Sequence, residues 1–487
     1  MGSLNGHNQL HVYIFPFMAH GHLIPAVDMA KLFASRGVKT TIVITPLNAA
    51  FFSKTIQKHS SSGRAEIQAR IIDFPAARAG LPEQCENLDF ITSQNLGMEA
   101  TINFFRASTM LQEPFEKLLE QDRPACVVAD MFYPWATESA AKFGIPRLVF
   151  HGTSCFAQCV GEALAAHAPQ QRVESDAEPF VLPGLPDEVR LTKRQLSPLA
   201  ALVGGTSFLS QLFKRVRESY SEVYGTVFNS FYELEPAYVD HFRKILGRKA
   251  WYVGPVSLCN GDVEDKASRG KGAVIDKDEC LKWLDSKEAN AVVYVCFGSQ
   301  ADFTAQQLRE IAVGIESSGQ PFIWVVRGRN DVEEDWLPKG FEESTAGRGL
   351  IIQGWAPQVL ILEHEAIGGF VTHCGWNSTL EGIAAGLPMV TWPVGAEQFY
   401  NEKLVTEVVK IGLEVGVEQS STYGVKMIRS DMVERAVRRI MSKEDEVMAE
   451  MRRKVKGLGE AARKALEAGG SSYSDLGALI EELELMS

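Results

Sequence analysis

The chain has 487 residues, a formal net charge of −12 at pH 7, and 45% hydrophobic residues. One domain commonly has roughly 100 to 200 residues, so this length predicts two or three domains. The acidic balance argues against a nucleic acid or an anionic membrane surface as partner. Any bound phosphate must therefore be held by local N–H groups and helix dipoles in a small, enclosed site.

The cysteines and the N-terminal segment indicate a cytoplasmic protein. Eight cysteines are scattered, without a CxxC pair or a Cys/His spacing suited to zinc, and several lie in apolar strands. Reduced thiols are typical of the cytosol. The segment MGSLNGHNQLHVYIF lacks the basic region of a secretory signal, and no apolar run approaches the ~20 residues that span a bilayer. We expect no metal site and no membrane insertion.

Strand and helix signals alternate from the start of the chain. An apolar run predicts a strand at 10–17, helical spacing predicts a helix at 23–35, and a second strand follows at 38–45. This βαβ unit predicts a parallel sheet covered by helices on both faces. The later elements predicted in this half are helix 51–58, strand 67–74, helix 98–120 with a break at Pro114, strand 125–129, helix 134–143, and strands 147–150, 226–229 and 251–253. Periodicity fails at 165–205, where we expect loops over a ligand cleft.

A polar stretch at 259–273 separates the two halves and is the predicted interdomain linker. The alternation restarts after it. The elements predicted next are strand 291–297, helix 304–318, and strands 321–326 and 349–353. We therefore divide the chain into an N-terminal domain, 1–258, and a C-terminal domain, 274–473.

The most informative stretch is 355–398, WAPQVLILEHEAIGGFVTHCGWNSTLEGIAAGLPMVTWPVGAEQ. Its first strand, 369–372, ends at a glycine turn and feeds a helix that begins Asn377-Ser378-Thr379. Free N–H groups and hydroxyls at the positive end of a helix dipole suit a phosphate. A second buried strand is predicted at 387–392, and Glu397-Gln398 follow its carboxyl end. Acid and amide side chains past the end of a strand suit hydroxyl groups such as those of a sugar.

This stretch resembles the signature box of plant secondary-metabolite UDP-glycosyltransferases, from W-A-P-Q through H-C-G-W-N-S and E-G to E-Q. The resemblance covers nearly the whole chain. It implies an α/β protein of the GT-B fold, in which two Rossmann-like domains face each other across a cleft and a final helix, 474–487, packs back on the N-terminal domain. We expect a monomer that binds UDP-glucose as donor substrate and a small-molecule acceptor, and that needs no cofactor.

The catalytic base is expected at the turn MAHGHLIP. It places His20 and His22 at the carboxyl end of a strand, where open α/β sheets bind ligands, and only one imidazole is expected to face the cleft. In the resembling family the base directly precedes the L-I-P, which corresponds to His22; His20 is the alternative. A neutral imidazole, with a pKa near ~6.5, can accept a proton at cytosolic pH. Asp130 stands at the family position of a carboxylate that fixes the tautomer and stabilises the imidazolium.

The resemblance also implies a donor-binding set. The implied roles are stacking on uracil for Trp355 and recognition of its edge by the backbone of Ala356, ribose binding for Gln358 and Glu381, diphosphate binding for Ser299, His373, Asn377 and Ser378, and sugar binding for Trp376, Glu397, Gln398 and Thr153. The HGTS turn leaves the register of Thr153 open by one residue. Gln398 and Trp376 resemble the glucose-using members, so the implied reaction is in-line displacement that yields a β-glucoside without metal.

A competing signal is the DxD string Asp276-Lys277-Asp278, the mark of metal-dependent glycosyltransferases of another fold. A DxD that binds metal should end a buried strand. This one follows only 273–275 and precedes helical spacing at 280–284, so capping of a helix start explains it better.

The acceptor is the least determined part of the site. FPFMAHGHLIP and DMFYPWATESAAKFGIPR resemble the branch that glucosylates flavonoids, hydroxycoumarins and triterpenoids, whose acceptor pockets are apolar. The expected wall residues are Phe17, Phe90, Phe132, Phe156 and Phe208. The alternative hypothesis is a non-catalytic nucleotide-sugar or small-molecule binder on the same fold. A Ser-His-Asp hydrolase is disfavoured because no G-x-S-x-G elbow occurs.

Overall fold

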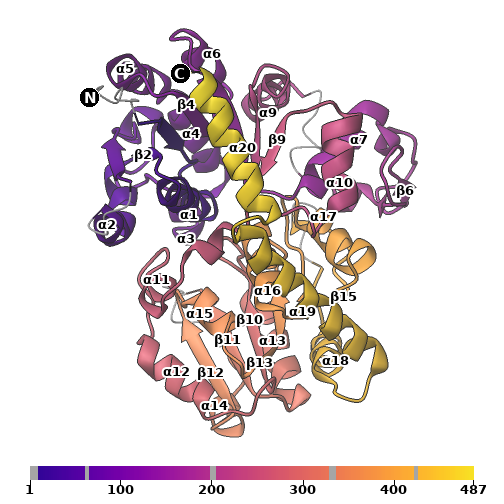
Figure 1. Cartoon of the computed structure of the whole chain (residues 1–487). Coiled ribbons are helices and arrows are strands. Elements are labelled where there is room, and N and C mark those ends of the chain that lie inside the picture. Colours follow the sequence, from indigo (N-terminus) through magenta and orange to yellow (C-terminus); the bar gives the residue numbers. More distant parts are fainter. Residues whose placement is uncertain (1–8, 61–64, 198–204, 328–335, 422–425, 487) are drawn as a thin grey trace.

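The fold is that of a computed structural model of the chain, which describes residues 9–60, 65–197, 205–327, 336–421 and 426–486 (Figure 1). The strands of the first sheet are β1 (His11–Phe15), β2 (Lys39–Ile44), β3 (Ile67–Ile71), β4 (Cys126–Asp130), β5 (Arg147–His151), β8 (Gly225–Phe228) and β9 (Ala250–Tyr252). Its helices are α1 (His20–Ser35), α2 (Pro46–Ser60), α3 (Leu88–Ser93), α4 (Gly97–Thr109), α5 (Gln112–Asp122), α6 (Ala136–Ala141), α7 (Cys155–His167), α9 (Phe208–Ser219) and α10 (Pro236–Asp240).

The second sheet lies in the lower half of the molecule as Figure 1 is drawn. Its strands are β10 (Val292–Cys296), β11 (Phe322–Val326), β12 (Gly349–Gln353), β13 (Ile367–Thr372), β14 (Met389–Thr391) and β15 (Gly412–Glu414). The helices of this half are α11 (Val263–Ala267), α12 (Lys277–Asp285), α13 (Ala305–Ser318), α14 (Phe341–Ser344), α15 (Gln358–Leu362), α16 (Trp376–Ala385), α17 (Gln398–Lys403), α18 (Ser430–Met441) and α19 (Glu446–Leu466). The last helix of the chain is α20 (Ser471–Met486).

Both sheets are parallel. The strand orders are β3-β2-β1-β4-β5-β8-β9 and β12-β11-β10-β13-β14-β15. Every residue of β4, β10 and β13 is buried, as the apolar runs predict, because helices cover both faces of a parallel sheet. Each sheet therefore presents the carboxyl ends of its central strands at one edge, where ligands bind in open α/β folds.

Three predicted segments differ from the structure. Residues 98–120 form two helices, α4 and α5, and the break lies at 110–111; Pro114 stands in the first turn of α5, where its missing N–H costs nothing. The polar stretch 259–273, where no helix was predicted, contains the short helix α11, which Asp262 caps by accepting a hydrogen bond from the N–H of Asp265 at 2.7 Å. The stretch 165–205, described except for 198–204, contains the end of α7 and a two-stranded hairpin, β6 (Phe180–Val181) with β7 (Arg190–Leu191).

Asp276 caps a helix, as the sequence predicts. Its carboxylate accepts hydrogen bonds from the N–H groups of Asp278 at 2.9 Å and Glu279 at 3.2 Å, at the start of α12. The Asp276-Lys277-Asp278 string therefore serves the fold of the second half.

The C-terminal helix α20 contacts the first half of the chain. The carboxylate of Asp475 accepts a hydrogen bond from the N–H of Tyr252, in β9, at 2.8 Å and pairs with Arg243 at 2.5 Å, and Ser472 donates to the carbonyl of Gly254 at 2.7 Å. Figure 1 shows α20 lying across the upper half, after α19 in the lower half. The end of the chain thus ties the two halves together.

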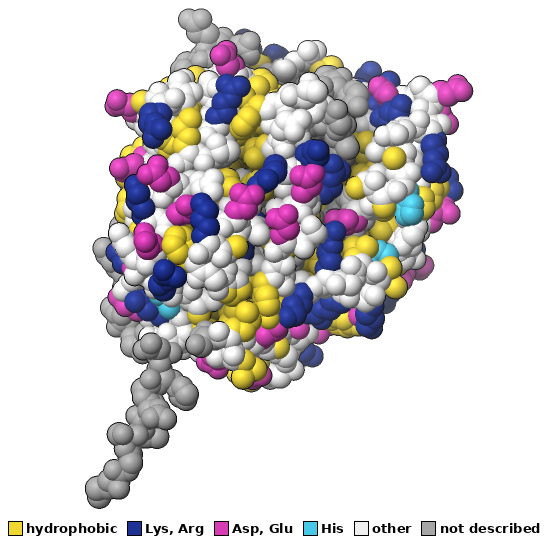
Figure 2. Space-filling view, turned by 90° about the horizontal axis from the view of Figure 1, so that it is seen from above, with side chains coloured by type: hydrophobic (Ala, Val, Ile, Leu, Met, Phe, Trp, Pro, Cys, Tyr) yellow, Lys and Arg dark blue, Asp and Glu magenta, His cyan; other side chains and the backbone are white. Residues whose placement is uncertain are grey.

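Two surface properties bear on partners. In the part of the chain that the structure describes, no helix has both the length and the apolar character that crossing a membrane requires. Figure 2 shows basic and acidic side chains interspersed over the face that it displays. Neighbouring charges of opposite sign cancel at a distance, so this face offers an anionic ligand little long-range attraction.

Candidate active site

A cavity of about 820 Å³ receives side chains from both halves of the molecule. Its first-half wall includes the turn between β1 and α1, and its second-half wall includes the turns after β10 and β13. The predicted catalytic and donor-binding residues that line it are His22, Thr153, Ser299, Trp355, Ala356, Gln358, His373, Trp376, Asn377, Ser378, Glu381, Glu397 and Gln398. The structure thus brings together residues from His22 to Gln398 at a cleft between the two sheets, the place where open α/β folds bind ligands.

His22 and Asp130 form a hydrogen-bonded pair. Nδ1 of His22 lies 2.7 Å from Oδ2 of Asp130, whose side chain is fully buried, while 22% of the His22 side chain is exposed at the cavity. A carboxylate only accepts, so Nδ1 carries the proton and Nε2 has a free lone pair. Burial acts to lower the pKa of His22, but the charge of Asp130 and the hydrogen bond to it outweigh this and raise the pKa above its usual value.

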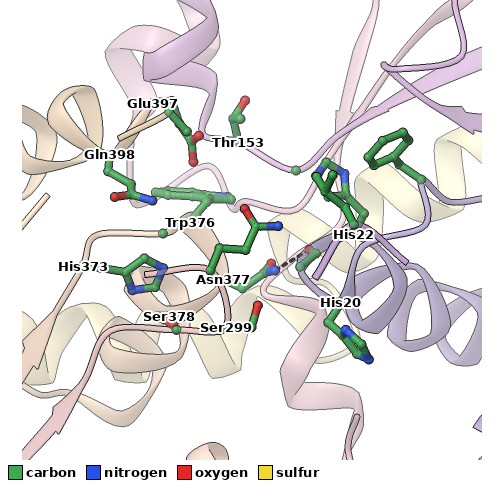
Figure 3. Close-up of a pocket in the computed structure, with 18 of the residues that line it drawn as sticks. His20, His22, Thr153, Ser299, His373, Trp376, Asn377, Ser378, Glu397 and Gln398 are labelled. Atoms are coloured by element: carbon green, nitrogen blue, oxygen red, sulfur yellow. Dashed lines mark hydrogen bonds between the residues drawn. The ribbon is translucent and has the colours of Figure 1, made fainter. Parts of the chain in front are cut away.

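His20 has a separate carboxylate. Its Nδ1 lies 2.5 Å from Oδ2 of Asp89 in α3, its side chain is buried, and its ring centre is 5.9 Å from that of Trp355. Burial raises the pKa of Asp89, but the hydrogen bond and charge of His20 outweigh this, and the pKa falls to about 2. Figure 3 shows the two imidazoles pointing apart. The two histidines of the HGH turn therefore have different environments, and His20 lies toward Trp355.

The N-terminus of α16 is open toward the cavity. Its cap, Gly375, provides no side-chain hydrogen bond, so the first N–H groups of the helix stay free for a ligand. Burial lowers the pKa of His373 to about 4, which keeps this ring neutral at pH 7. Its Nδ1 is buried and has no hydrogen-bond partner among the described residues. An oxyanion placed here would meet neutral donors and a helix dipole.

The residues expected to bind the ribose are already joined. Nε2 of Gln358 donates to Oε2 of Glu381 at 2.7 Å and to the hydroxyl of Ser378 at 3.0 Å. Glu381 also forms an ion pair with Arg269. The acidic and amide groups are therefore held in one geometry before any donor arrives.

Gln398 directs its amide nitrogen into the cavity. Its Oε1 accepts hydrogen bonds from the N–H groups of Val394 at 2.7 Å and Gly395 at 3.0 Å, so Nε2 remains for a ligand. Figure 3 shows Gln398, Glu397 and Thr153 around the indole of Trp376. The indole N–H of Trp376 is used by the carbonyl of Asn229 at 2.7 Å, which leaves this residue its ring surface and backbone for contacts in the cavity.

Comparisons with known proteins show the family of this chain. The family described as UDP-glucoronosyl and UDP-glucosyl transferase matches residues 54–449. The chain belongs to the UDP-glycosyltransferase family. Scopoletin glucosyltransferase of Nicotiana tabacum is 57% identical over 479 residues, which cover 98% of this chain and 99% of that protein. Anthocyanin 3'-O-beta-glucosyltransferase of Gentiana triflora is 51% identical over 482 residues and 98% of each chain.

Solved structures place this UDP-glycosyltransferase in the GT-B fold. Glycyrrhiza uralensis UGT73P12, complexed with glycyrrhetinic acid 3-O-monoglucuronide, superposes with a TM-score of 0.91 at 44% identity, over 98% of this chain and 96% of that one. Medicago truncatula UGT71G1, complexed with UDP-glucose, superposes with a TM-score of 0.78 at 25% identity, over 98% of both chains. The two facing sheets are thus the two Rossmann-like domains expected from the sequence.

The remaining wall of this glycosyltransferase's cavity is largely aromatic and aliphatic. Phe17 and Phe132 line it, as predicted, with their ring centres 4.9 Å apart. Further apolar lining residues that the sequence did not single out are Phe105, Met131, Phe213 and Val216. Phe213 and Val216 lie in α9, three residues apart, so the amphipathic spacing of that helix was the available signal.

Three phenylalanines expected in the wall do not line this cavity. Phe156 is fully buried and packs edge-on against Tyr238 at 4.7 Å, because it follows the cap of α7 and turns into the core. Phe208, at the start of α9, lies under the guanidinium of Arg106 at 5.3 Å. Phe90 packs against the core of the first domain from α3. The aromatic residue type alone did not show whether each ring points into the cavity or packs elsewhere.

Charged and polar residues outside the signature stretch also line the cavity. Among them are Asp89, Arg269, Lys271, Gln300 and Arg327. Gln300 donates to Oδ1 of Asp89 at 2.9 Å, which joins the turn after β10 to α3 of the other domain. Sequence reasoning missed these residues because their partners are distant in the chain.

Proposed function

We propose that this UDP-glycosyltransferase transfers glucose from UDP-glucose to a hydroxyl group of a small lipophilic plant metabolite, such as a phenolic, flavonoid or triterpenoid, and forms a β-O-glucoside. The observation that carries the proposal is that His22, which is hydrogen-bonded to Asp130, and the donor residues of 355–398 face one cavity from opposite domains. The tobacco and gentian relatives, a scopoletin glucosyltransferase and an anthocyanin glucosyltransferase, support this substrate class.

His22 is the proposed base. The acceptor hydroxyl donates its proton to Nε2, because Nδ1 is engaged by Asp130. The acceptor oxygen then forms a bond to the anomeric carbon as the bond from that carbon to UDP breaks. Attack from the side opposite the leaving group inverts the configuration. Asp130 stabilises the imidazolium through the hydrogen bond and its charge.

The second domain would stabilise the departing UDP. Negative charge develops on the diphosphate as it leaves, and the free N–H groups of α16, with Ser299, His373 and Asn377, would donate to it. Because these donors and the helix dipole supply the stabilisation, the proposed step needs no divalent ion. Uracil would lie against Trp355, and the ribose hydroxyls would donate to Glu381.

The proposed setting is the cytoplasm, and the proposed form is the monomer. All eight cysteines are free thiols, and seven of them are buried, which suits a reducing compartment. The cavity is lined by the two domains of one chain, so a second copy is not required to complete it.

The test is incubation of the purified protein with UDP-glucose and a mixed panel of phenolic, flavonoid and triterpenoid acceptors, read by mass spectrometry. Products that carry one added hexose, together with stoichiometric UDP, are expected, and NMR of the product should show a β-linkage. Treatment with EDTA should leave the rate unchanged, whereas loss of turnover that Mg²⁺ restores would reject the metal-free step. Binding of UDP-glucose without product for any acceptor would favour a non-catalytic binder.

A further inference from the structure

Arg269 connects the interdomain linker to a carboxylate in each domain. Its Nε donates to Oδ2 of Asp28, in α1, at 2.7 Å, and its Nη1 pairs with Oε1 of Glu381, in α16. Only 11% of the Arg269 side chain is exposed. Figure 1 shows α11, which directly precedes Arg269, at the level where the two halves meet.

The pair with Glu381 compensates a buried charge. Asp28 and Glu381 are both buried. Asp28 has further polar support, because Nδ2 of Asn260 donates to its Oδ1 at 2.9 Å and Lys31 lies 3.9 Å away. In the described part of the chain, Arg269 is the cation paired with Glu381, whose other oxygen accepts the amide N–H of Gln358 at 2.7 Å. A buried carboxylate without a paired cation is costly, so loss of the ion pair should displace the Glu381 side chain.

The linker backbone next to Arg269 is fixed against the donor site. Gly270 has a φ of +86°, and a Cβ atom there would lie 2.8 Å from the ring of Trp355 and 2.8 Å from Cδ1 of Ile24. The N–H of Val274 donates to the carbonyl of Trp355 at 3.0 Å. The segment that carries Arg269 is therefore seated between α1 and Trp355, which leaves the guanidinium little freedom to leave Glu381.

We propose that Arg269 is a positioning residue for the donor: it holds the Glu381 carboxylate in the orientation in which it can accept hydrogen bonds from the two ribose hydroxyls. A carboxylate has about four lone-pair sites. The bonds from Arg269 and Gln358 use two of them, which leaves two for the 2′- and 3′-hydroxyls. The inference rests on the proposed function, because it takes Glu381 as the ribose ligand.

The test compares UDP with 2′,3′-dideoxy-UDP, which lacks both ribose hydroxyls, by calorimetry. The variant R269Q should weaken UDP binding by roughly 10-fold or more, the loss typical of a partner to a charged group. It should leave the weaker binding of the dideoxy ligand unchanged. The variant R269K, which keeps the charge, should recover part of the UDP affinity. A merely structural role would lower both affinities alike.

A matched control is K58Q. Lys58 also forms ion pairs to the linker, with Asp262 at 2.9 Å and Asp265 at 2.7 Å, but on an exposed surface outside the cavity. This variant should bind both ligands as the wild type does. Should R269Q fail to fold, D28N tests the same point, since it loosens Arg269 and should weaken UDP binding selectively, though less.

Two results would overturn the inference. Equal weakening of UDP and dideoxy-UDP in R269Q would mean that Arg269 acts on the diphosphate or on the fold. Unchanged binding of UDP would mean that Glu381 does not depend on Arg269. Failure of the proposed function is distinguishable, because then the wild-type protein would not bind UDP, or E381Q would bind UDP and dideoxy-UDP in the wild-type ratio.

Discussion

His22, in the first turn of α1, and Asp130, the last residue of β4, meet with Nδ1 2.7 Å from Oδ2. The strands β1 and β4 pair in parallel, with Phe15 opposite Ala129, so the residues that follow them come together at one edge of the sheet. The contact orients the imidazole and sets its tautomer. It therefore makes one nitrogen of the ring available to a substrate in the cavity.

Replacing His22 should remove the base without removing the donor site. H22Q is expected to lower kcat by a factor of about 100 to 10,000, the range typical of a general base. The affinity for UDP, measured by calorimetry, should stay the same, because the nucleotide residues belong to the other domain. The control is H364Q, a histidine paired with Asp285 at 3.1 Å away from the cavity, which should keep its activity. Full turnover by H22Q would place the base elsewhere.

The pH dependence of kcat/KM should reflect the ionisation of His22 beside Asp130. Asp130 raises the pKa of His22 above its usual value of 6.5. As the pH decreases through this raised pKa, His22 takes up a proton and can no longer act as a base, so kcat/KM should fall. D130N removes the charge that raises the pKa. The acid limb of the profile should therefore move to lower pH, and the plateau should drop because the imidazolium loses its stabilising partner. If the acid limb of the D130N profile does not move, the group that titrates in this limb is not His22.

A glycine next to His373 should be needed for donor binding. A Cβ atom on Gly375 would overlap the imidazole of His373, although the φ of −59° at this position is open to any residue. G375A should therefore displace the ring and weaken UDP binding by roughly 10-fold, through the lost hydrogen bond to a charged oxygen. G457A, with open space around it in α19, is the control. UDP affinity equal to that of the wild type would show that His373 does not contact the diphosphate.

Gln398 should contribute to binding of the sugar of UDP-glucose and not to binding of the nucleotide. Its amide nitrogen faces the cavity, because its oxygen is held by Val394 and Gly395. Q398A should raise the Kd of UDP-glucose by roughly 10-fold, the size of one or two lost hydrogen bonds, and change the Kd of UDP much less. Competition binding with the two ligands measures the difference. The same change for both ligands would contradict a role at the sugar.

The C-terminal helix should contribute to stability. Asp475 accepts the backbone N–H of Tyr252 at 2.8 Å and pairs with Arg243 at 2.5 Å, which fixes α20 on β9. D475N should lower the free energy of unfolding by about 1 to 3 kcal/mol, the cost of weakening a hydrogen bond to a charged group. The midpoint of thermal unfolding should decrease, whereas UDP affinity at low temperature should persist. An unchanged midpoint would show that α20 is held by its apolar face alone.

The parallel sheets and the local parts of the donor site could be predicted from the amino-acid pattern alone. Runs such as those of β4, β10 and β13 are apolar throughout because both faces of the strand are covered, and this pattern is visible without any tertiary information. The cap at Asp276 and the turn from β13 into α16 were also predictable, because the interacting groups lie within a few residues of each other. Trp355 through Gln398 form one continuous segment, which the family resemblance could assign position by position.

Which side chains meet across the fold became known from the packing of the elements. It paired His20 with Asp89, turned Phe156 into the core, and placed Arg269 against Glu381, whereas the pairing of His22 with Asp130 was already implied by the family resemblance. Each of these outcomes depends on packing between elements that are far apart in the chain. A period of 2 or 3.6 residues specifies one element and its buried face, but it carries no information about the partner that this face will meet.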